Sequence, residues 1–436
     1  MDWKRVIAGV AALVAVACGG GGDSGTNPGT NTPPVIAFAF VPMATEKNIP
    51  VDLTVTATDA DDDPLTITWT VTRGSLAAQN SKKTVMRWTV PSTVGVDTVN
   101  ISVSDGTVTR KLTEEIRVAT KYQTGSFLKS ASPYILATAG TNPRLAVPSG
   151  STLTIEAGTE IYINAPGLIV DVTGTLSAHG SAADPIIIRH NDRTFVCGGS
   201  NNSGWQGIQL SREAGAPAAG TADLDYVELW YPVDGVRVQD DAILTMNNSS
   251  VRCSKHAGVW MEGSGVVHLI DSELSNGAGD GLAIAAFASV PDSVIVQGCT
   301  LSINNGSGIR MDLNDTTKSA FIDVQFNDFQ FNATHGISLA HSVFPAIHNN
   351  NFRGNGDSSV SSLYLQSGYP GVAQAELDAT CNFWGSASGS CATIDIGIHD
   401  SLDQSTVHTR VKSCPWLNSN PITTTPNCSP TCTACP

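Results

Sequence analysis

The chain has 436 residues and a formal net charge of −15 at pH 7; 41% of its residues are hydrophobic and 14% are charged. This length is enough for two or three domains. The acidic balance excludes nucleic acid as a partner, because phosphate binding requires basic patches. Few charges together with 41 glycines favour short strands and tight turns over helices. We therefore expect an all-β protein.

The N-terminus predicts export. Two basic residues precede an apolar run at residues 6–16, which has the length of a signal peptide and is too short to span a bilayer. Ala15-Val16-Ala17-Cys18 follows and resembles the lipobox of bacterial lipoproteins, with Ala15 where that family prefers Leu. The resemblance implies a signal peptide at residues 1–17, lipidation of Cys18, and anchoring at the outer membrane or cell surface. The alternative is an ordinary signal peptide cut after Ala17.

Residues 18–34 contain many Gly, Ser, Asn and Pro residues and predict a flexible tether. Residues 35–118 then show four segments in which apolar and polar residues alternate, with turn residues between them. This pattern predicts a β-sandwich. The segment TATDADDDPLTITWTV, followed by VNISVSDG, resembles bacterial immunoglobulin-like domains of the cadherin-like and PKD type.

That resemblance implies a possible calcium site in the acidic turns of the sandwich. Asp59, Asp61 and Asp63 occupy alternate positions, and Asp105 lies in the SDG turn. Carboxylates that converge at one end of a domain suit a hard cation such as calcium. The alternative is that these residues form a solvated loop, since Asp is common in turns.

Residues 119–145 have no clear period and are expected to form a linker. From residue 146 on, a repeat governs the sequence. Four segments align on the apolar residues Val251, Leu274, Leu301 and Phe329, which are spaced by 23, 27 and 28 residues. Seven residues after each anchor stands a glycine, and an aliphatic residue follows it. A repeat of this length indicates stacked coils whose parallel strands lie about 4.8 Å apart.

The repeat explains Asn304-Asn305-Gly306, which by itself has the pattern of a hairpin turn. In the alignment this segment is the bend between two strands of one coil, and Asn304, Asn332 and Asn355 share one column. A second column contains Ser249, Ser272, Cys299, Asn327 and Asn350. Stacked Asn side chains hydrogen-bond along a column, so both columns are expected to be structural.

These features resemble the right-handed parallel β-helix, or pectin-lyase-like, family. Further matches are GLIVDVTGTLSAHGSAADPIIIRH, and the closing CNFWGSASG with CPWLNSNP. The resemblance implies a right-handed parallel β-helix over residues 146–417, preceded by the immunoglobulin-like sandwich and followed by a Cys-containing tail at 418–436. It says little about function, because this fold carries lyases, hydrolases, epimerases, adhesins and scaffolds.

Arg310 and Asp312 are the catalytic candidates, because strand alternation points both outward on either side of Met311. The family uses such surfaces for polysaccharide chemistry. The repeated Asp motifs of its lyases and hydrolases and the signature of its epimerases are absent from the sequence. Trp230, Tyr231, Trp260 and Tyr364 are candidates for contact with a glycan, or alternatively pack beneath loops.

The cysteines predict disulfides in an exported chain. Nine cysteines follow Cys18, so at least one lacks an intramolecular partner. Cys381 and Cys391 flank a Gly/Ser-rich loop and are expected to close it. The crowded C-terminal cysteines are expected to form disulfides rather than a metal site, since no His accompanies them. They are Cys414, Cys428, Cys432 and Cys435.

The sequence favours a non-catalytic role in adhesion or polysaccharide binding at the cell surface. The partners expected are a membrane, through the lipid anchor, and a polysaccharide or a cell-surface protein. One alternative is a polysaccharide lyase, epimerase or hydrolase that uses Arg310 and Asp312. A second is a purely structural subunit of a surface assembly. No cofactor is required, and calcium is the candidate ion.

Overall fold

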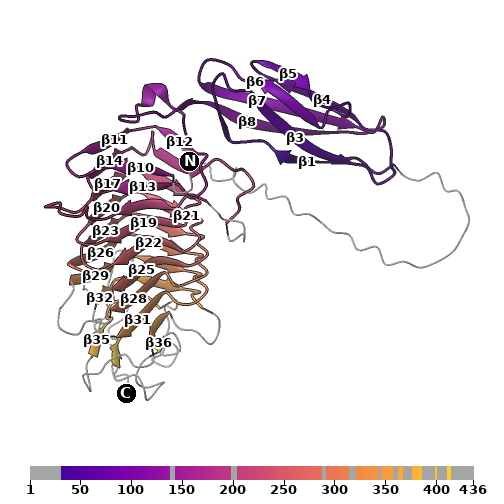
Figure 1. The fold of residues 1–436 in the computed structure, drawn as a ribbon. Helices are drawn as coiled ribbons and strands as arrows, with labels where there is room; N and C mark the ends of the chain where they lie inside the picture. Colours follow the sequence, from indigo (N-terminus) through magenta and orange to yellow (C-terminus); the bar gives the residue numbers. More distant parts are fainter. Residues whose placement is uncertain are drawn as a thin grey trace, which may run out of the picture.

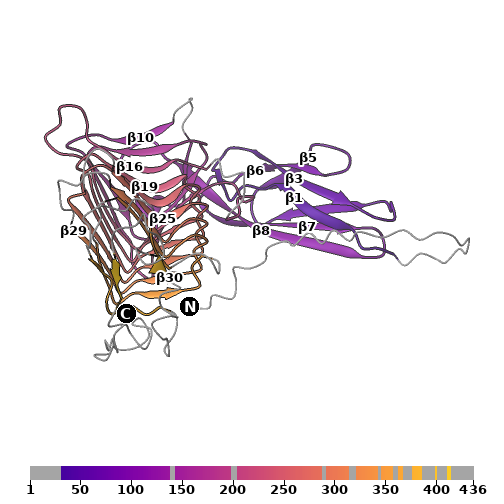
Figure 2. The same cartoon turned by 90° about the horizontal axis from the view of Figure 1, so that it is seen from below.

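The computed structural model describes residues 31–137, 143–197, 204–286, 291–313, 321–341, 345–356, 362–366, 376–384, 398–399 and 410–413. It shows a β-sandwich beside a tall stack of parallel coils (Figures 1 and 2). A short 3-10 helix covers Lys129–Ala131. Within the described residues, none of the helices has the length and hydropathy needed to cross a membrane.

The sandwich forms from the alternating segments at residues 35–121. Its first sheet has the order β1-β3-β6-β5, and its second contains β4, β7 and β8, with β2 beside β8. Trp88, Val99, Ile101 and Ile116 are fully buried between the two sheets, as the alternating pattern predicts. The strands are β1 (Val35–Phe40), β2 (Ala44–Glu46), β3 (Val51–Thr58), β4 (Thr66–Val71), β5 (Ser75–Ala78), β6 (Val85–Thr89), β7 (Gly95–Ser104) and β8 (Thr109–Lys121).

The coil stack has three parallel sheets. The ten-stranded sheet contains β10 (Arg144–Val147), β13 (Ile169–Val172), β16 (Gly207–Leu210), β19 (Asp234–Gln239), β22 (Ala257–Glu262), β25 (Asp280–Ala286), β28 (Ile309–Leu313), β31 (Ile337–His341), β34 (Leu363–Leu365) and β36 (Ile398–His399). The eight-stranded sheet contains β11 (Thr152–Glu156), β14 (Thr175–His179), β17 (Thr221–Asp225), β20 (Ile243–Asn247), β23 (Val266–Ile270), β26 (Ser293–Gln297), β29 (Phe321–Gln325) and β32 (Ala346–His348).

The thirteen-stranded sheet joins the two bodies. It begins with β4, β7 and β8 of the sandwich and continues through β9 (Tyr134–Leu136), β12 (Glu160–Ile163), β15 (Ile186–His190), β18 (Val227–Trp230), β21 (Ser250–Arg252), β24 (Glu273–Ser275), β27 (Thr300–Ser302), β30 (Asp328–Gln330) and β33 (Asn351–Arg353). Residues 119–145, expected as a linker, therefore include β9, which pairs with both β8 and β12. Two further strands, β35 (Glu376–Asp378) and β37 (Arg410–Lys412), pair separately.

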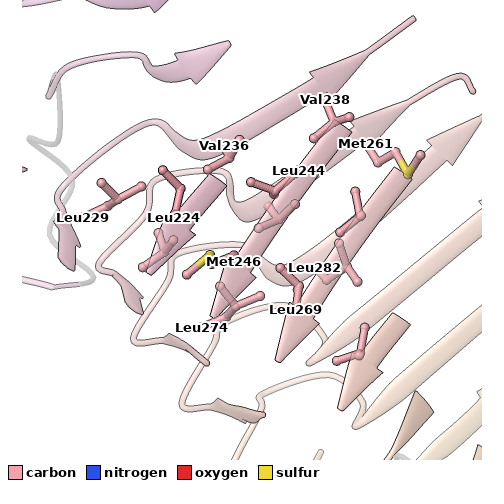
Figure 3. Packing of buried hydrophobic residues seen from close by; sticks show 14 of the residues in the cluster. Leu224, Leu229, Val236, Val238, Leu244, Met246, Met261, Leu269, Leu274 and Leu282 are labelled. Carbon is pink, nitrogen blue, oxygen red and sulfur yellow. The ribbon is translucent and has the colours of Figure 1, made fainter. Parts of the chain in front are cut away.

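One continuous apolar core fills the coils, and Figure 3 shows how its side chains interlock from coil to coil. Val238, Met261 and Ile284 are fully buried and stack in register on the ten-stranded sheet. Lower in the stack, Phe329 and Phe352 lie face to face with their ring centroids 4.9 Å apart. Burying each such side chain contributes roughly 1.5–3 kcal/mol. Because these side chains contact their counterparts in the next coil, the core stabilises the stack through contacts between coils rather than within single coils.

The glycine column of the repeat has a steric cause. A Cβ atom built on Gly258 would lie 2.6 Å from the carbonyl oxygen of Gly281, and one on Gly281 would lie 2.6 Å from that of Gly308. Contacts this short are forbidden, so only glycine allows the coils to approach at this bend.

Both Asn columns are hydrogen-bonded ladders, which confirms the structural interpretation. Asn304 Nδ2 donates to Asn332 Oδ1 at 3.0 Å, and Asn332 Nδ2 donates to Asn355 Oδ1 at 2.9 Å. In the second column, Asn327 and Asn350 are joined in the same way at 3.0 Å. All of these side chains are buried, and their amides satisfy backbone groups of adjacent coils that would otherwise lack partners.

Candidate functional site

The outward face of the ten-stranded sheet carries both catalytic candidates, Arg310 and Asp312, and two of the four aromatic candidates, Trp260 and Tyr364. Met311 is fully buried, and its neighbours Arg310 and Asp312 are partly exposed on either side of it, as alternation predicts. Strand register then aligns residues of successive coils into one outward column. From β19 to β34 this column contains Arg237, Trp260, Ala283, Arg310, Ser338 and Tyr364.

Arg310 is held by a carboxylate of the preceding coil. Its Nε donates to Asp280 Oδ2 at 2.7 Å, and Asp280 Oδ1 accepts the backbone N–H of Ser307 at 2.8 Å. The guanidinium carbon also lies 5.7 Å from the ring centre of Trp260. Arg310 is therefore a neutralised, fixed group, whereas an arginine that acts as a base would need to be free of such a partner.

A buried carboxylate and an exposed histidine lie next to Trp260. His256 Nδ1 is 2.7 Å from Asp234 Oδ1, and the imidazole and indole centroids are 4.2 Å apart. Asp234 is only 6% exposed, and burial raises the pKa of its carboxyl group, an effect that the contact with His256 partly offsets. An aspartate in this position orients the imidazole ring.

The alignment of the coil repeats in the sequence did not reveal the Asp234–His256 pair. Asp234 precedes Gly235, just as Asp280 precedes Gly281, but Gly235 follows its anchor Leu229 after six residues instead of seven. Because that coil is one residue shorter at the bend, Asp234 did not align with Asp280 in the sequence. Allowing a deletion at the bend would have placed Asp234 in the column of Asp280.

Charged groups higher on the same face are also paired. Arg237 donates to Glu262 at 2.6 Å, and Gln239 Nε2 donates to the other carboxylate oxygen at 2.6 Å. Burial alone would raise the pKa of Glu262, but the hydrogen bonds from Arg237 and Gln239 lower it on balance. Arg144 is paired in the same way with Asp171. Each of these arginines is therefore neutralised by a carboxylate of the same face.

The four aromatic candidates do not form one surface. Trp260 and Tyr364 belong to the outward column, and the Tyr364 ring stacks on His335 with centroids 4.3 Å apart. Trp230 and Tyr231 lie instead on or next to β18 of the thirteen-stranded sheet. There, the guanidinium carbons of Arg189 and Arg252 lie 5.6 and 5.1 Å from the Trp230 ring centre.

The acidic turn of the sandwich brings three of its four candidates together. Single carboxylate oxygens of Asp59, Asp61 and Asp63 lie within 4.8 Å of one another, and burial and these neighbours raise the pKa of Asp63. Asp59 Oδ2 is buried without a hydrogen-bond partner among the described residues. Asp105 lies close enough to affect Asp63, but its oxygens accept hydrogen bonds from Asn31, Thr107 and Val108.

Among the cysteines, the structure contains a disulfide that the sequence analysis did not select. Cys197 and Cys253 are bonded across 56 residues, which ties the loop after β15 to the coil of β21. Cys299 is a free, buried thiol whose pKa is raised by burial to about 12. Cys381 is disulfide-bonded to a partner outside the described residues. Outside them too lie Cys18, Cys391, Cys414, Cys428, Cys432 and Cys435.

Comparison with known families agrees with this architecture. Residues 206–372 match the family described as a right handed beta helix region, and residues 31–115 match the bacterial Ig domain family. The chain carries a bacterial Ig domain followed by a right-handed β-helix. The fold predicted from the sequence is thus confirmed. No curated protein and no solved structure matches the chain significantly.

The β-helix and the Ig domain are held together by side chains as well as by their shared sheet. Asn191, which follows β15 of the β-helix, hydrogen-bonds both backbone groups of Ala44 in the Ig domain. Arg193 pairs with Glu114 of β8. The disulfide at Cys197 fixes the same loop at its other end. The Ig domain is therefore a fixed extension of the thirteen-stranded sheet and lies to one side of the ten-stranded sheet (Figure 2).

Proposed function

We propose that this protein binds a neutral polysaccharide on the outward face of the ten-stranded sheet, without cleaving it. The observation that carries the proposal is the column that runs across successive coils through Trp260, Arg310 and Tyr364. Because adjacent coils lie about 4.8 Å apart, the column offers a line of aromatic and hydrogen-bonding groups that is interrupted at the buried Ala283. A linear polymer is the ligand that suits a line rather than a closed pocket.

The charges of this face favour a neutral polymer over a polyuronate. Arg144, Arg237 and Arg310 are each neutralised by a carboxylate of the same face. The whole chain also carries a net charge of −15. An acidic polymer would meet repulsion here, because like charges oppose association.

The pairing of Arg310 also supports binding rather than cleavage. Proton abstraction by Arg310 would require a neutral guanidine group, which would leave the partly buried carboxylate of Asp280 without its charged partner. The specific observation that favours an enzyme is the Asp234–His256 pair, whose exposed imidazole has the arrangement of an oriented acid or base. A polysaccharide-cleaving enzyme is therefore the second candidate function, with His256 as well as Arg310 in its site.

The experiment that separates these functions uses the chain from residue 18 on, with Cys18→Ser to prevent lipidation. It is incubated with xylan, mannan, polygalacturonate and alginate, with and without calcium. Retention by the neutral polymers without chain shortening is expected. Shortened polysaccharide chains or new unsaturated ends would show that the protein cleaves the polymer, which would contradict the proposal of binding without cleavage. Absence of both effects across all four polymers would favour a structural role in a surface assembly.

We further propose that the protein is exported and anchored through a lipid on Cys18, with residues 19–30 as the tether. The supporting observations are the apolar run at residues 6–16 and the polar, Gly-rich stretch after Cys18. Metabolic labelling with a palmitate analogue tests this. Label in the wild-type chain and none in Cys18→Ala is expected, and equal labelling of both would contradict it.

Calcium binding in the acidic turn of the Ig domain is also proposed. Three carboxylates within 4.8 Å, one with a buried oxygen that lacks a partner, provide the hard oxygen ligands that calcium requires. Calcium is expected to raise the melting temperature of the wild-type chain and to leave that of Asp61→Asn unchanged. Equal shifts in both, or no shift in either, would exclude this site.

A further inference from the structure

A small polar hollow lies on the thirteen-stranded sheet, on a different face from the proposed polymer site. It has a volume of about 240 Å³ and lies between residues 182–185 and the strands β18, β21 and β24. The side chains that matter for its chemistry are those of Glu228, Ser250, Arg252, Asp271 and Glu273. The proposed function does not use any of them.

The hollow exists because a short residue stands between two long ones. Glu228, Ser250 and Glu273 occupy one outward column in adjacent coils, and each alternates with a buried residue of the core. Both glutamates extend past the strand surface, whereas Ser250 does not. The space above Ser250 is therefore left open between the two carboxylates.

Ser250 is itself an unsatisfied group. Its residue is only 6% exposed, and its Oγ has no hydrogen-bond partner among the described residues. Buried hydroxyl groups are nearly always hydrogen-bonded, because leaving one unpaired costs about 1–3 kcal/mol. Since alternation directs Ser250 outward and the residue lines the hollow, its hydroxyl lies at the base of the hollow without a partner among the described residues.

The walls of the hollow are fixed before any ligand arrives. Arg252 Nε donates to Glu273 Oε1 at 3.2 Å, and Ser275 Oγ also donates to this carboxylate. On the other side, Trp230 Nε1 donates to Glu228 Oε2 at 3.1 Å. These contacts leave Glu228 Oε1 and the exposed carboxylate of Asp271 as acceptors without a partner among the described residues. A preorganised wall reduces the ordering cost of binding.

The donor and acceptor groups decide the class of ligand. Three carboxylates and one guanidinium give the lining a net negative charge, which disfavours anions. The carboxylates are also too dispersed for a metal ion, because the described residues show such a convergence of oxygens only at Asp59, Asp61 and Asp63. Groups that both donate and accept hydrogen bonds, such as the hydroxyls of a sugar, match one open hydroxyl and two open carboxylates.

We propose that this hollow binds a single neutral sugar ring. Its hydroxyls donate hydrogen bonds to Glu228 and Asp271, and one hydroxyl oxygen accepts the hydrogen bond of Ser250. A volume of about 240 Å³ corresponds to one sugar ring, so the site suits a chain end, a branch or a monosaccharide. This site is independent of the polymer site, since its residues lie on another sheet.

Saturation-transfer NMR with the methyl glycosides of glucose, galactose, mannose and xylose tests the proposal on the chain from residue 18 on. At least one glycoside is expected to receive magnetisation from the wild-type protein. Ser250→Gln fills the hollow and is expected to weaken that binding at least tenfold. Asp271→Asn changes an exposed residue with a φ of 48°, which Asn also tolerates, and is expected to weaken binding less.

Two control variants make the result specific. Asp223→Asn changes an exposed carboxylate of β17 on the eight-stranded sheet, and Trp260→Ala changes the polymer face. Both are expected to bind the glycoside like the wild type. Signal transfer to no glycoside would overturn the proposal, as would unchanged binding by a folded Ser250→Gln. Loss of glycoside binding in Trp260→Ala alone would show that the glycoside binds on the polymer face. If no polymer retains the protein in the earlier experiment, this test of the hollow is unaffected.

Discussion

Asn191 and Ala44 are joined by two hydrogen bonds that resemble a pair in a β-ladder. Ala44 N–H donates to Asn191 Oδ1 at 2.7 Å, and Asn191 Nδ2 donates to Ala44 O at 2.9 Å. The two residues are 147 positions apart and belong to different domains. One side-chain amide thus satisfies both backbone groups of a buried residue at the domain junction, where neither group has access to water.

Replacing Asn191 by Ala is expected to destabilise the junction. Both buried backbone groups of Ala44 would lose their partner, at a cost of about 2–3 kcal/mol. Differential scanning calorimetry should show a lower melting temperature or a separate transition of the Ig domain. Asn305→Ala, at an exposed bend position, serves as the control and should change little. Equal effects of the two substitutions would contradict this role for Asn191.

Ile303 offers a substitution that should stabilise the protein. It has a φ of 56° and is 54% exposed, although a β-branched residue is strained in this left-handed region. The same corner holds Asn276 in the preceding coil and Gly354 two coils further on, and both residue types adopt such a φ more readily. Ile303→Asn is expected to raise the free energy of unfolding by about 1 kcal/mol in urea titrations.

The matched variant for this prediction is Ile303→Val. It shortens the side chain but keeps the β-branch, so the backbone strain remains and no gain is expected. If Val stabilises the protein as much as Asn does, the exposed apolar area rather than the φ angle is the cause. If neither variant stabilises it, the strain at this corner is negligible.

Asn350 should show how much one rung of the Asn ladder contributes. Its amide donates to Val324 O at 2.8 Å and accepts the backbone N–H of Asn327 at 2.9 Å. Asn350→Leu removes these partners and is expected to cost about 3 kcal/mol in chemical denaturation. Asn350→Ser should cost clearly less, because Ser249 accepts a backbone N–H in the same column at 2.9 Å. Similar losses for Leu and Ser would contradict the ladder interpretation.

His190 gives a prediction about pH. Burial lowers the pKa of its imidazole from 6.5, while nearby Asp192 opposes the shift, so the unfolded chain binds the proton more readily than the folded one. Stability from this group is therefore complete above about pH 7 and is lost as the pH falls through the ordinary His range. His190→Phe, which keeps the contact with Phe195, should lose less stability between about pH 7 and pH 5.

The comparison for His190 is the difference between the two stability curves, measured by urea denaturation. Part of the slope will remain in the variant, because burial also lowers the pKa of His268. Parallel curves for the wild type and His190→Phe would show that His190 is not the group responsible. A steeper decrease of the free energy of unfolding in the variant would show that His190 contributes to the pH dependence with the opposite sign.

The fold could be predicted from the sequence because the same residue types recur at the same positions of successive coils. Gly258, Gly281 and Gly308 recur for a steric reason, and the Asn columns recur because each amide serves the next coil. Strand alternation also placed Arg310 and Asp312 outward. In contrast, side-chain partners depend on the direction of long side chains across coils, so the sequence did not indicate that Arg310 pairs with Asp280.

Other parts of the site left little trace in the sequence. Cys197 and Cys253 are separated by 56 residues and have no common motif, so only the fold brings them together. Asp234 was hidden by the coil that is one residue shorter. The open hydroxyl of Ser250 depends on which neighbouring side chains are long, and this is known only once the register of β18, β21 and β24 is known.

The most direct test of the central claim is the retention of the wild type and two variants by an immobilised neutral polysaccharide, selected from the polymers that retain the wild type. Trp260→Ala combined with Tyr364→Ala removes both aromatic groups of the outward column, whereas Phe321→Ala removes an exposed aromatic group of the eight-stranded sheet. Loss of retention in the double variant, with Phe321→Ala retained like the wild type, is the predicted result. Equal retention of all variants would show that the outward face of the ten-stranded sheet is not the binding surface.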